Sequence, residues 1–121
     1  MLDIFSTATG TKRQATLIRR HLEIPIITER LEKDILIIQL SSINDYSRDD
    51  IQKVMAKYTE YGAILLDLRN NGGGTLQSAV DVGSLFLAPG KLVASVDGDD
   101  AAQYISHGTK DLGIPIFLLV N

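Results

Sequence analysis

The pattern of apolar and polar residues predicts short strands in the first third of the chain. Residues 11–20 (TKRQATLIRR) and 23–31 (EIPIITERL) are β-rich runs on either side of His21-Leu22, and apolar residues alternate in the second run. This arrangement predicts a hairpin. Pro25 lacks a backbone donor, which favours an edge position for its strand. Residues 35–40 (ILIIQL) form a denser apolar run, and we expect that strand to be buried.

The sequence then changes to a helical period. Apolar residues follow i, i+3, i+4 and i+7 spacing, as on one face of an amphipathic helix, at Ile51, Val54, Met55 and Tyr58. Ser47 with Asp50 resembles a capping box at the start of this helix, and Gly62 supplies a stop signal. A second helix is predicted over residues 76–87, ended by Pro89-Gly90, with one face formed by Leu76, Val80 and Leu87.

Three further apolar runs complete the predicted sheet. They cover residues 63–68 (AILLDL), 91–96 (KLVASV) and 114–120 (IPIFLLV). Alternation of strands with helices predicts right-handed crossovers and an α/β fold with a mixed sheet, preceded by the β-hairpin piece. Residues 97–113 are rich in Asp and Gly, so we expect a surface loop with a short ordered piece.

The last apolar run also bears on the extent of the chain. A run as apolar as residues 116–120 is typical of a strand in the middle of a parallel sheet. Loops that carry chemistry usually follow the carboxyl ends of such strands. We therefore expect that the chain is a piece of a longer protein that continues past Asn121.

Composition excludes several classes of partner. The 121 residues carry a net charge of −3 with a pI of about 5.2, so no basic surface attracts nucleic acid. The absence of Cys excludes disulfides, thiolate nucleophiles and thiolate zinc sites. No apolar run reaches about 18 residues, so we expect no membrane insertion by this chain. Residues 1–10 lack the regions of a signal peptide, and the compartment stays open.

Candidate chemistry concentrates in residues 63–74, AILLDLRNNGGG, where a buried strand leads into Gly72, Gly73 and Gly74. Glycines between a strand and a helix let a ligand approach the backbone, and the helix N-terminus attracts negative charge. The patterns of dinucleotide-binding and P-loop phosphate sites both fail here. Three interpretations stay open: a phosphate site of another kind, an oxyanion hole of backbone N–H groups, or a tight turn without chemistry.

Other candidate side chains favour structural roles. Six serines are nucleophiles in principle: Ser41, Ser42, Ser78, Ser84, Ser95 and Ser106. Ser106 and His107 are adjacent, but chain neighbours seldom point at each other, and no acid is evident to orient the ring. His21 is expected in solvent at a turn. Asp67 and Arg69 bracket a strand end, where an ion pair or hydrogen bonds to the next loop are expected. A tract with three aspartates lacks the spacing and distal Glu of an EF-hand, so no metal and no cofactor are expected at Asp97, Asp99 and Asp100.

Taken together, residues 65–87 (LLDLRNNGGGTLQSAVDVGSLFL) resemble the signature of the C-terminal processing, or tail-specific, peptidases. In that family a strand ends in D-L-R-N-N, followed by a variable residue, here Gly72, and a Gly-Gly pair. Residues 10–20 are similar to the closing strand of the family's PDZ domain, and residues 24–31 to the strand that leaves it. Weaker similarity covers Tyr104 to Gly108 and residues 114–121 (IPIFLLVN), which match the strand before the nucleophile.

The resemblance implies a serine endopeptidase with a Ser–Lys dyad that cleaves proteins near their C-termini. Its nucleophile and base would lie beyond Asn121, so the chain itself is expected to be inactive. The backbone N–H groups of Gly74 and, second, Gly73 would be oxyanion donors. The residues expected to structure this loop are Asp67, Arg69, Asn70 and Asn71.

The resemblance also implies a division of the chain. Residues 1–31 would be a remnant of the PDZ domain with connecting strands, and residues 32–121 part of the protease core. The expected partner is a protein or peptide substrate, and relatives commonly work outside the cytoplasm. The alternative is a non-catalytic module that binds peptides or forms a homo-oligomer through an exposed sheet edge.

Overall fold

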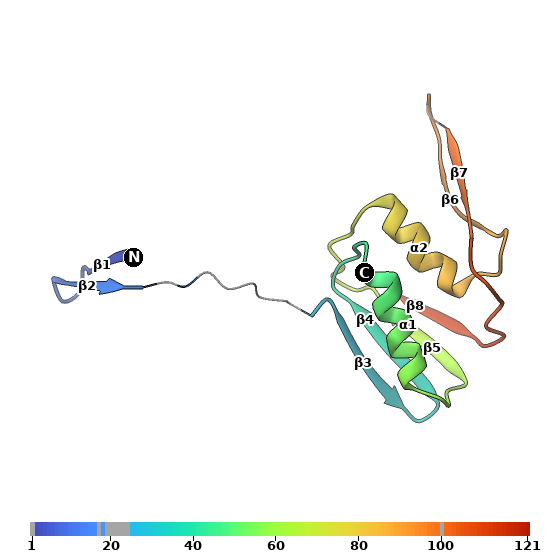
Figure 1. Cartoon of the computed structure of the whole chain (residues 1–121), viewed down its shortest axis with the longest axis horizontal. Helices are drawn as coiled ribbons and strands as arrows, with labels where there is room; N and C mark the ends of the chain where they lie inside the picture. The colour runs from blue at the N-terminus through green and yellow to red at the C-terminus, as the bar shows by residue number, and fades with distance from the viewer. Residues whose placement is uncertain (1, 17, 19–24, 100) are drawn as a thin grey trace.

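The computed structural model describes residues 2–16, 18, 25–99 and 101–121 (Figure 1). Within these residues the elements, in chain order, are β1 (Leu2–Ser6), β2 (Thr11–Ala15), β3 (Ile27–Glu32), β4 (Ile35–Leu40), α1 (Ser47–Lys57), β5 (Ala63–Asp67), α2 (Leu76–Phe86), β6 (Leu92–Val96), β7 (Ala102–Ile105) and β8 (Ile116–Leu119). The alternation of strands with helices after residue 27 confirms the predicted α/β class.

A four-stranded mixed sheet forms the centre of the fold, in the order β3-β4-β5-β8. β3 is antiparallel to β4, whereas β4, β5 and β8 are parallel. Both crossovers move along the sheet in the same direction, so right-handed connections put α1 and α2 on the same face. Figure 1 shows α1 in front of β4 and β5, with α2 beside α1. The carboxyl ends of three parallel strands therefore meet at one edge.

The core lies between this sheet and its two helices. Leu36, Ile38 and Leu40 alternate along β4 and are fully buried, because one face of the strand points at the helices. They cluster with buried residues of β5, α1 and α2, namely Ile64, Leu66, Ile51 and Val82. The dense apolar runs at residues 35–40 and 63–68 were thus correct predictors of buried strands.

The predicted hairpin between residues 11–20 and 23–31 is wrong. β2 pairs instead with β1, and β3 pairs with β4. Each pair is joined by a tight turn that contains a left-handed residue, Gly10 (φ 64°) or Lys33 (φ 55°), so the closer sequence neighbours pair. The predicted turn at His21-Leu22 lies outside the described residues. β3 is at the sheet edge as predicted, although it begins after Pro25.

The helix boundaries differ from the predicted caps. Ser47 does not form a capping box with Asp50; its hydroxyl accepts the Asn44 N–H (2.9 Å), and Tyr46 is the N-cap residue. α1 ends at Lys57, before Gly62, whose N–H donates to the backbone and the carboxylate of Asp34. Gly62 therefore forms a tertiary contact with the turn between β3 and β4 and does not end α1.

The predicted buried face of the second helix is only partly correct. Val80 is buried, but Leu76 and Leu87 are 41% and 36% exposed. The residues that α2 buries are mostly small, namely Ser78, Val80, Val82 and Ser84. Small side chains lie inward because neighbouring segments approach this helix closely.

Two strands do not take the predicted places. β6 pairs antiparallel with β7 in a separate two-stranded sheet instead of joining the parallel one. β8 was expected in the middle of the sheet, but among the described residues it pairs with β5 alone. Phe117 and Leu118 on β8 are 53% and 60% exposed. None of the described helices is both long and apolar enough to cross a membrane.

Candidate functional site

The glycine loop joins β5 to α2 at the carboxyl edge of the parallel strands. Gly72 N–H donates to Ser41 O (2.9 Å), and Ile43 N–H donates to Gly73 O (2.9 Å). These two hydrogen bonds resemble a continuation of the pairing between β4 and β5 past the ends of both strands. The loop is therefore held against the segment that leaves β4.

Asn71 fixes the same loop with its side chain. Its Nδ2 donates to Leu40 O at 2.9 Å, and its Oδ1 accepts the Gly73 N–H at 2.7 Å. Its own N–H donates to Leu68 O at 3.0 Å. One amide side chain thus bonds to a backbone carbonyl of β4 and to a backbone N–H of the loop.

Two of the three glycines are required by geometry. Gly73 has φ of 84°, which favours glycine. A Cβ on Gly74 would overlap the backbone carbonyl of Ile43, so only glycine fits there without a shift. A Cβ on Gly72 would meet its nearest atom, Ser41 O, at an ordinary 3.8 Å. The position that varies in the resembled signature is thus the one with room.

The backbone donors of the loop differ in their use. Gly72 and Gly73 N–H groups are bonded within the chain, as described above. Among the hydrogen bonds between described residues, none has the Gly74 N–H as donor, and Gly74 is exposed to solvent. Thr75 then caps α2, its Oγ1 accepting the Ser78 N–H at 3.1 Å. A backbone donor in a fixed loop at a helix N-terminus can stabilise a negative oxygen.

Asp67 and Arg69 form the predicted ion pair at the end of β5. Arg69 Nε and Nη2 lie 2.9 Å and 2.7 Å from the two oxygens of Asp67. Asp67 is only 5% exposed. These hydrogen bonds from Arg69 lower the pKa of the Asp67 carboxyl to about 2. The carboxylate stays charged at neutral pH, which suits a structural anchor and not a proton carrier.

Asn70 links the loop to β8. Its N–H donates to Asn121 Oδ1 at 3.0 Å, and Asn121 Nδ2 donates to Asn70 Oδ1 at 3.2 Å. Asn70 has φ of 59°, a left-handed conformation that Asn tolerates better than most residues. No pattern in the sequence indicates this contact, because 51 positions separate the two residues.

His107 meets a different serine from the one beside it in the chain. Ser106 Oγ donates to Leu87 O (2.9 Å), whereas His107 Nδ1 lies 3.2 Å from Ser84 Oγ and Nε2 lies 3.4 Å from Asp81 Oδ1. Ser84 is fully buried and donates to Val80 O at 2.7 Å, so its hydroxyl is engaged and shielded. The contact fastens the loop after β7 to α2. In the sequence, the only sign of this contact is the i, i+3 spacing of Asp81 and Ser84, which puts both on one face of α2.

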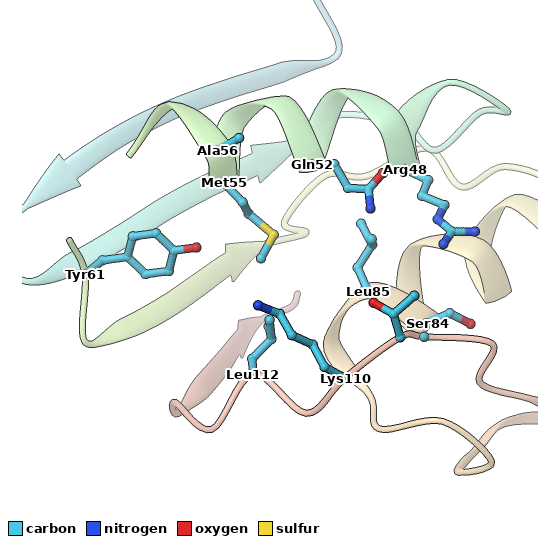
Figure 2. Close-up of a pocket in the computed structure, with 11 residues that line it drawn as sticks. Arg48, Gln52, Met55, Ala56, Tyr61, Ser84, Leu85, Lys110 and Leu112 are labelled. Atoms are coloured by element: carbon cyan, nitrogen blue, oxygen red, sulfur yellow. The ribbon is translucent and has the colours of Figure 1, made fainter. Parts of the chain in front are cut away.

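A surface pocket of about 300 Å³ lies between α1, α2 and the segment after β7 (Figure 2). Figure 2 shows apolar Met55, Leu85 and Leu112 with the cationic Arg48 and Lys110 around it. No residue of the glycine loop lines it. In the described part of the chain, no three His, Cys, Asp or Glu side chains are grouped to hold a metal ion.

Similarity to known proteins bears on the glycine loop. The model of peptidase family S41 matches residues 34–121. A carboxyl-terminal-processing protease of Synechocystis is 27% identical over 99% of this chain and 30% of its own length. A tail-specific protease of Haemophilus influenzae is 30% identical over 84% of this chain and 17% of its own length.

The fold is also found in a solved structure. A photosystem II D1 C-terminal processing protease superposes with a TM-score of 0.65 and 24% identity, over 95% of this chain and 34% of that one. The chain thus spans about a third or less of the relatives that it matches. Since the family model covers well over half of its residues, the chain belongs to peptidase family S41.

Proposed function

We propose that the chain supplies the oxyanion loop of a serine endopeptidase that cleaves proteins near their C-termini. The observation that carries this proposal is the Gly74 N–H, which is unused within the described residues and sits in a loop held on both sides. Relatives named carboxyl-terminal-processing and tail-specific proteases support the same activity. The substrate class is a protein or peptide chain.

In this proposal, the loop supplies an oxyanion donor, with Gly74 as the first candidate and Gly73 as the second, and the N–H that follows the nucleophile supplies the other donor. The Gly73 N–H already donates to Asn71 Oδ1, which favours Gly74 for the main role. Asp67, Arg69, Asn70 and Asn71 hold the loop in place. A donor of this kind stabilises the negative oxygen that develops when a nucleophile attacks a peptide carbonyl.

The remaining machinery would come from outside the 121 residues. A serine that follows β8 would attack, and a lysine with a pKa lowered by burial would take its proton. Residues 1–31 would close a PDZ domain and connect it to the core, and residues 32–121 would form part of that core. The isolated chain would then show no turnover.

The test removes the Gly74 N–H without adding atoms. Gly74→Pro or Gly74→Ala would push a Cβ against Ile43, so a side-chain substitution mixes two effects. Replacing Gly74 by glycolic acid gives a backbone ester that lacks the donor and adds no side chain, and it also weakens the Gly73 carbonyl as acceptor of the Ile43 N–H. In the complete protease we expect kcat/KM to fall about 10²- to 10³-fold, because one oxyanion donor contributes roughly 2.7–4 kcal/mol.

The control is the same ester at Gly98, in the turn between β6 and β7. Its kcat/KM is expected to match the unmodified enzyme. A Gly74 ester with full activity and an unchanged unfolding midpoint would refute the assignment.

A second candidate function is association through the open edge of β8. Phe117, Leu118 and Val120 on or next to β8 are exposed, and among the described residues the edge of β8 away from β5 has no partner strand. Such an edge can add a peptide or a second copy. Light scattering coupled to size-exclusion chromatography tests it. A concentration-dependent dimer of the isolated chain supports association, and a strict monomer up to high micromolar concentration argues against it.

A further inference from the structure

We infer that Asn70 and Asn121 are a positioning pair that aligns the oxyanion loop with the segment following β8. The inference rests on the proposed function, because alignment matters only if that segment brings the nucleophile. The pair consists of two reciprocal hydrogen bonds, Asn70 N–H to Asn121 Oδ1 (3.0 Å) and Asn121 Nδ2 to Asn70 Oδ1 (3.2 Å).

The pair begins where backbone pairing of β5 with β8 ends. The register runs from Ile64↔Ile116 to Asp67↔Leu119, and the last backbone bond is Leu68 N–H to Leu119 O at 2.8 Å. Beyond this point the two strands leave the sheet into separate segments. Two residues further along each segment, Asn70 and Asn121 bond to each other where the next backbone hydrogen bonds of the sheet would lie.

The other ties of the loop lead to β4 instead. Asn71, Gly72 and Gly73 bond to the segment that leaves β4, through Leu40, Ser41 and Ile43. Among the described residues, Asn70 is the only member of the segment 70–75 bonded to Asn121 or to β8. The position of Gly74 relative to the exit of β8 therefore depends on this contact.

Positioning explains the pair better than stability does. Asn70 is exposed, and a hydrogen bond at the surface exchanges with water at little net gain. The left-handed backbone at Asn70 aims its N–H and its side chain at the same partner. A cost in backbone conformation at a site of low stability gain is typical of functional constraint.

The chemical consequence follows from the geometry of an oxyanion hole. One donor is on the glycine loop and the other follows the nucleophile, so two separate segments must converge on one oxygen. Misplacement by about 1 Å can cost 10²-fold in rate. The pair would therefore affect kcat more than substrate binding, because the developing charge exists only in the transition state.

The test uses Asn121→Leu in the complete protease. Leu is close to Asn in size and removes both hydrogen bonds. We expect kcat to fall about 10- to 100-fold while KM changes less than about twofold. The unfolding midpoint is expected to stay close to that of the parent. Gln103→Leu, an exposed amide-to-Leu change on β7, is the matched control and is expected to keep parental kinetics.

Rescue distinguishes the pair from a general surface effect. Asn70→Gly keeps the left-handed backbone but removes the acceptor for Asn121 Nδ2, so kcat should fall. Asn70→Asp restores that acceptor and should recover most of the loss. Asn121→Leu with parental kcat would overturn the inference. An Asn70→Asp enzyme with a kcat as low as that of Asn70→Gly would overturn it too.

Labelling of the parent enzyme separates this inference from the proposed function. A fluorophosphonate probe should modify one serine after Asn121 in the parent protease. If it labels none, the proposed function fails. If it labels that serine and Asn121→Leu is fully active, only the positioning pair fails.

Discussion

The guanidinium of Arg69 donates two hydrogen bonds, of 2.9 Å and 2.7 Å, to the nearly buried carboxylate of Asp67, two residues before it. The Arg69 N–H also reaches Asp67 Oδ1 at 3.1 Å. The pair turns the chain out of β5 and into the glycine loop. It makes the stability of this exit dependent on pH.

The pH dependence has a defined direction. Folding lowers the pKa of Asp67 from its ordinary 3.8 to about 2, so the unfolded chain binds more protons between these values. The contribution of Asp67 is complete above about pH 4 and is lost as the pH falls towards 2. In urea unfolding, Asp67→Asn should be less stable than the parent at pH 7, and the difference should shrink near pH 2. Asp97→Asn, in an exposed loop, is the control and should keep the stability of the parent at pH 7.

Gly74→Ala is expected to destabilise the chain, because the new Cβ would overlap Ile43 O. The loss should be about 1–3 kcal/mol, as for other forced overlaps. Gly72→Ala has room at 3.8 Å and should stay within about 0.5 kcal/mol of the parent. Equal unfolding free energies for the two variants would contradict this account of the loop.

Asn71→Ala should loosen the loop without unfolding the sheet. It leaves Leu40 O and the Gly73 N–H without their side-chain partner. Hydrogen exchange of the Gly73 amide should accelerate, whereas the amides of β4 and β5 keep their protection. Asn71→Asp retains the acceptor for Gly73 and should preserve part of the protection there. Unchanged exchange at Gly73 in Asn71→Ala would show that the side chain does not hold the loop.

Ser84→Ala should cost stability but no catalysis. It removes the oxygen that accepts the His107 N–H at 3.3 Å and contacts the ring at 3.2 Å. We expect a loss of about 1–3 kcal/mol, the usual cost of leaving such a donor unpaired. Ser95→Ala, at an exposed position of β6, should be nearly neutral. If the complete protease that we propose lost its peptidase activity in a fully folded Ser84→Ala variant, this hydroxyl would instead have a chemical role.

The sequence predicted the buried strands well because their signal is local. Residues 35–40 and 63–68 are apolar enough to require burial wherever they lie, and parallel pairing follows from the helices between strands. The predicted pairing of residues 23–31 with residues 11–20 was wrong. Both segments pair instead across tight turns, β2 with β1 at Gly10 and β3 with β4 at Lys33, and the apolar pattern does not indicate these turns.

Contacts between distant residues limited the prediction of the site. The glycines and the Asp67–Arg69 pair are close in sequence, so their roles could be proposed. The partners of Asn70 and His107 lie 51 and 23 positions away, and no periodicity connects them. Ser47 shows the converse: the spacing to Asp50 was suitable, but Asn44 competes for the same hydroxyl.

The hydrogen bonds between the glycine loop and residues 41–43 have a consequence for how members of the family can differ from one another. The wall that keeps Gly74 a glycine is the carbonyl of Ile43, which belongs to the connection between β4 and α1. A backbone donor has no side chain of its own to select, so its position is inherited from that neighbour. Insertions or deletions in this short connection would therefore change the position of the Gly74 N–H, while the glycines themselves stay unchanged.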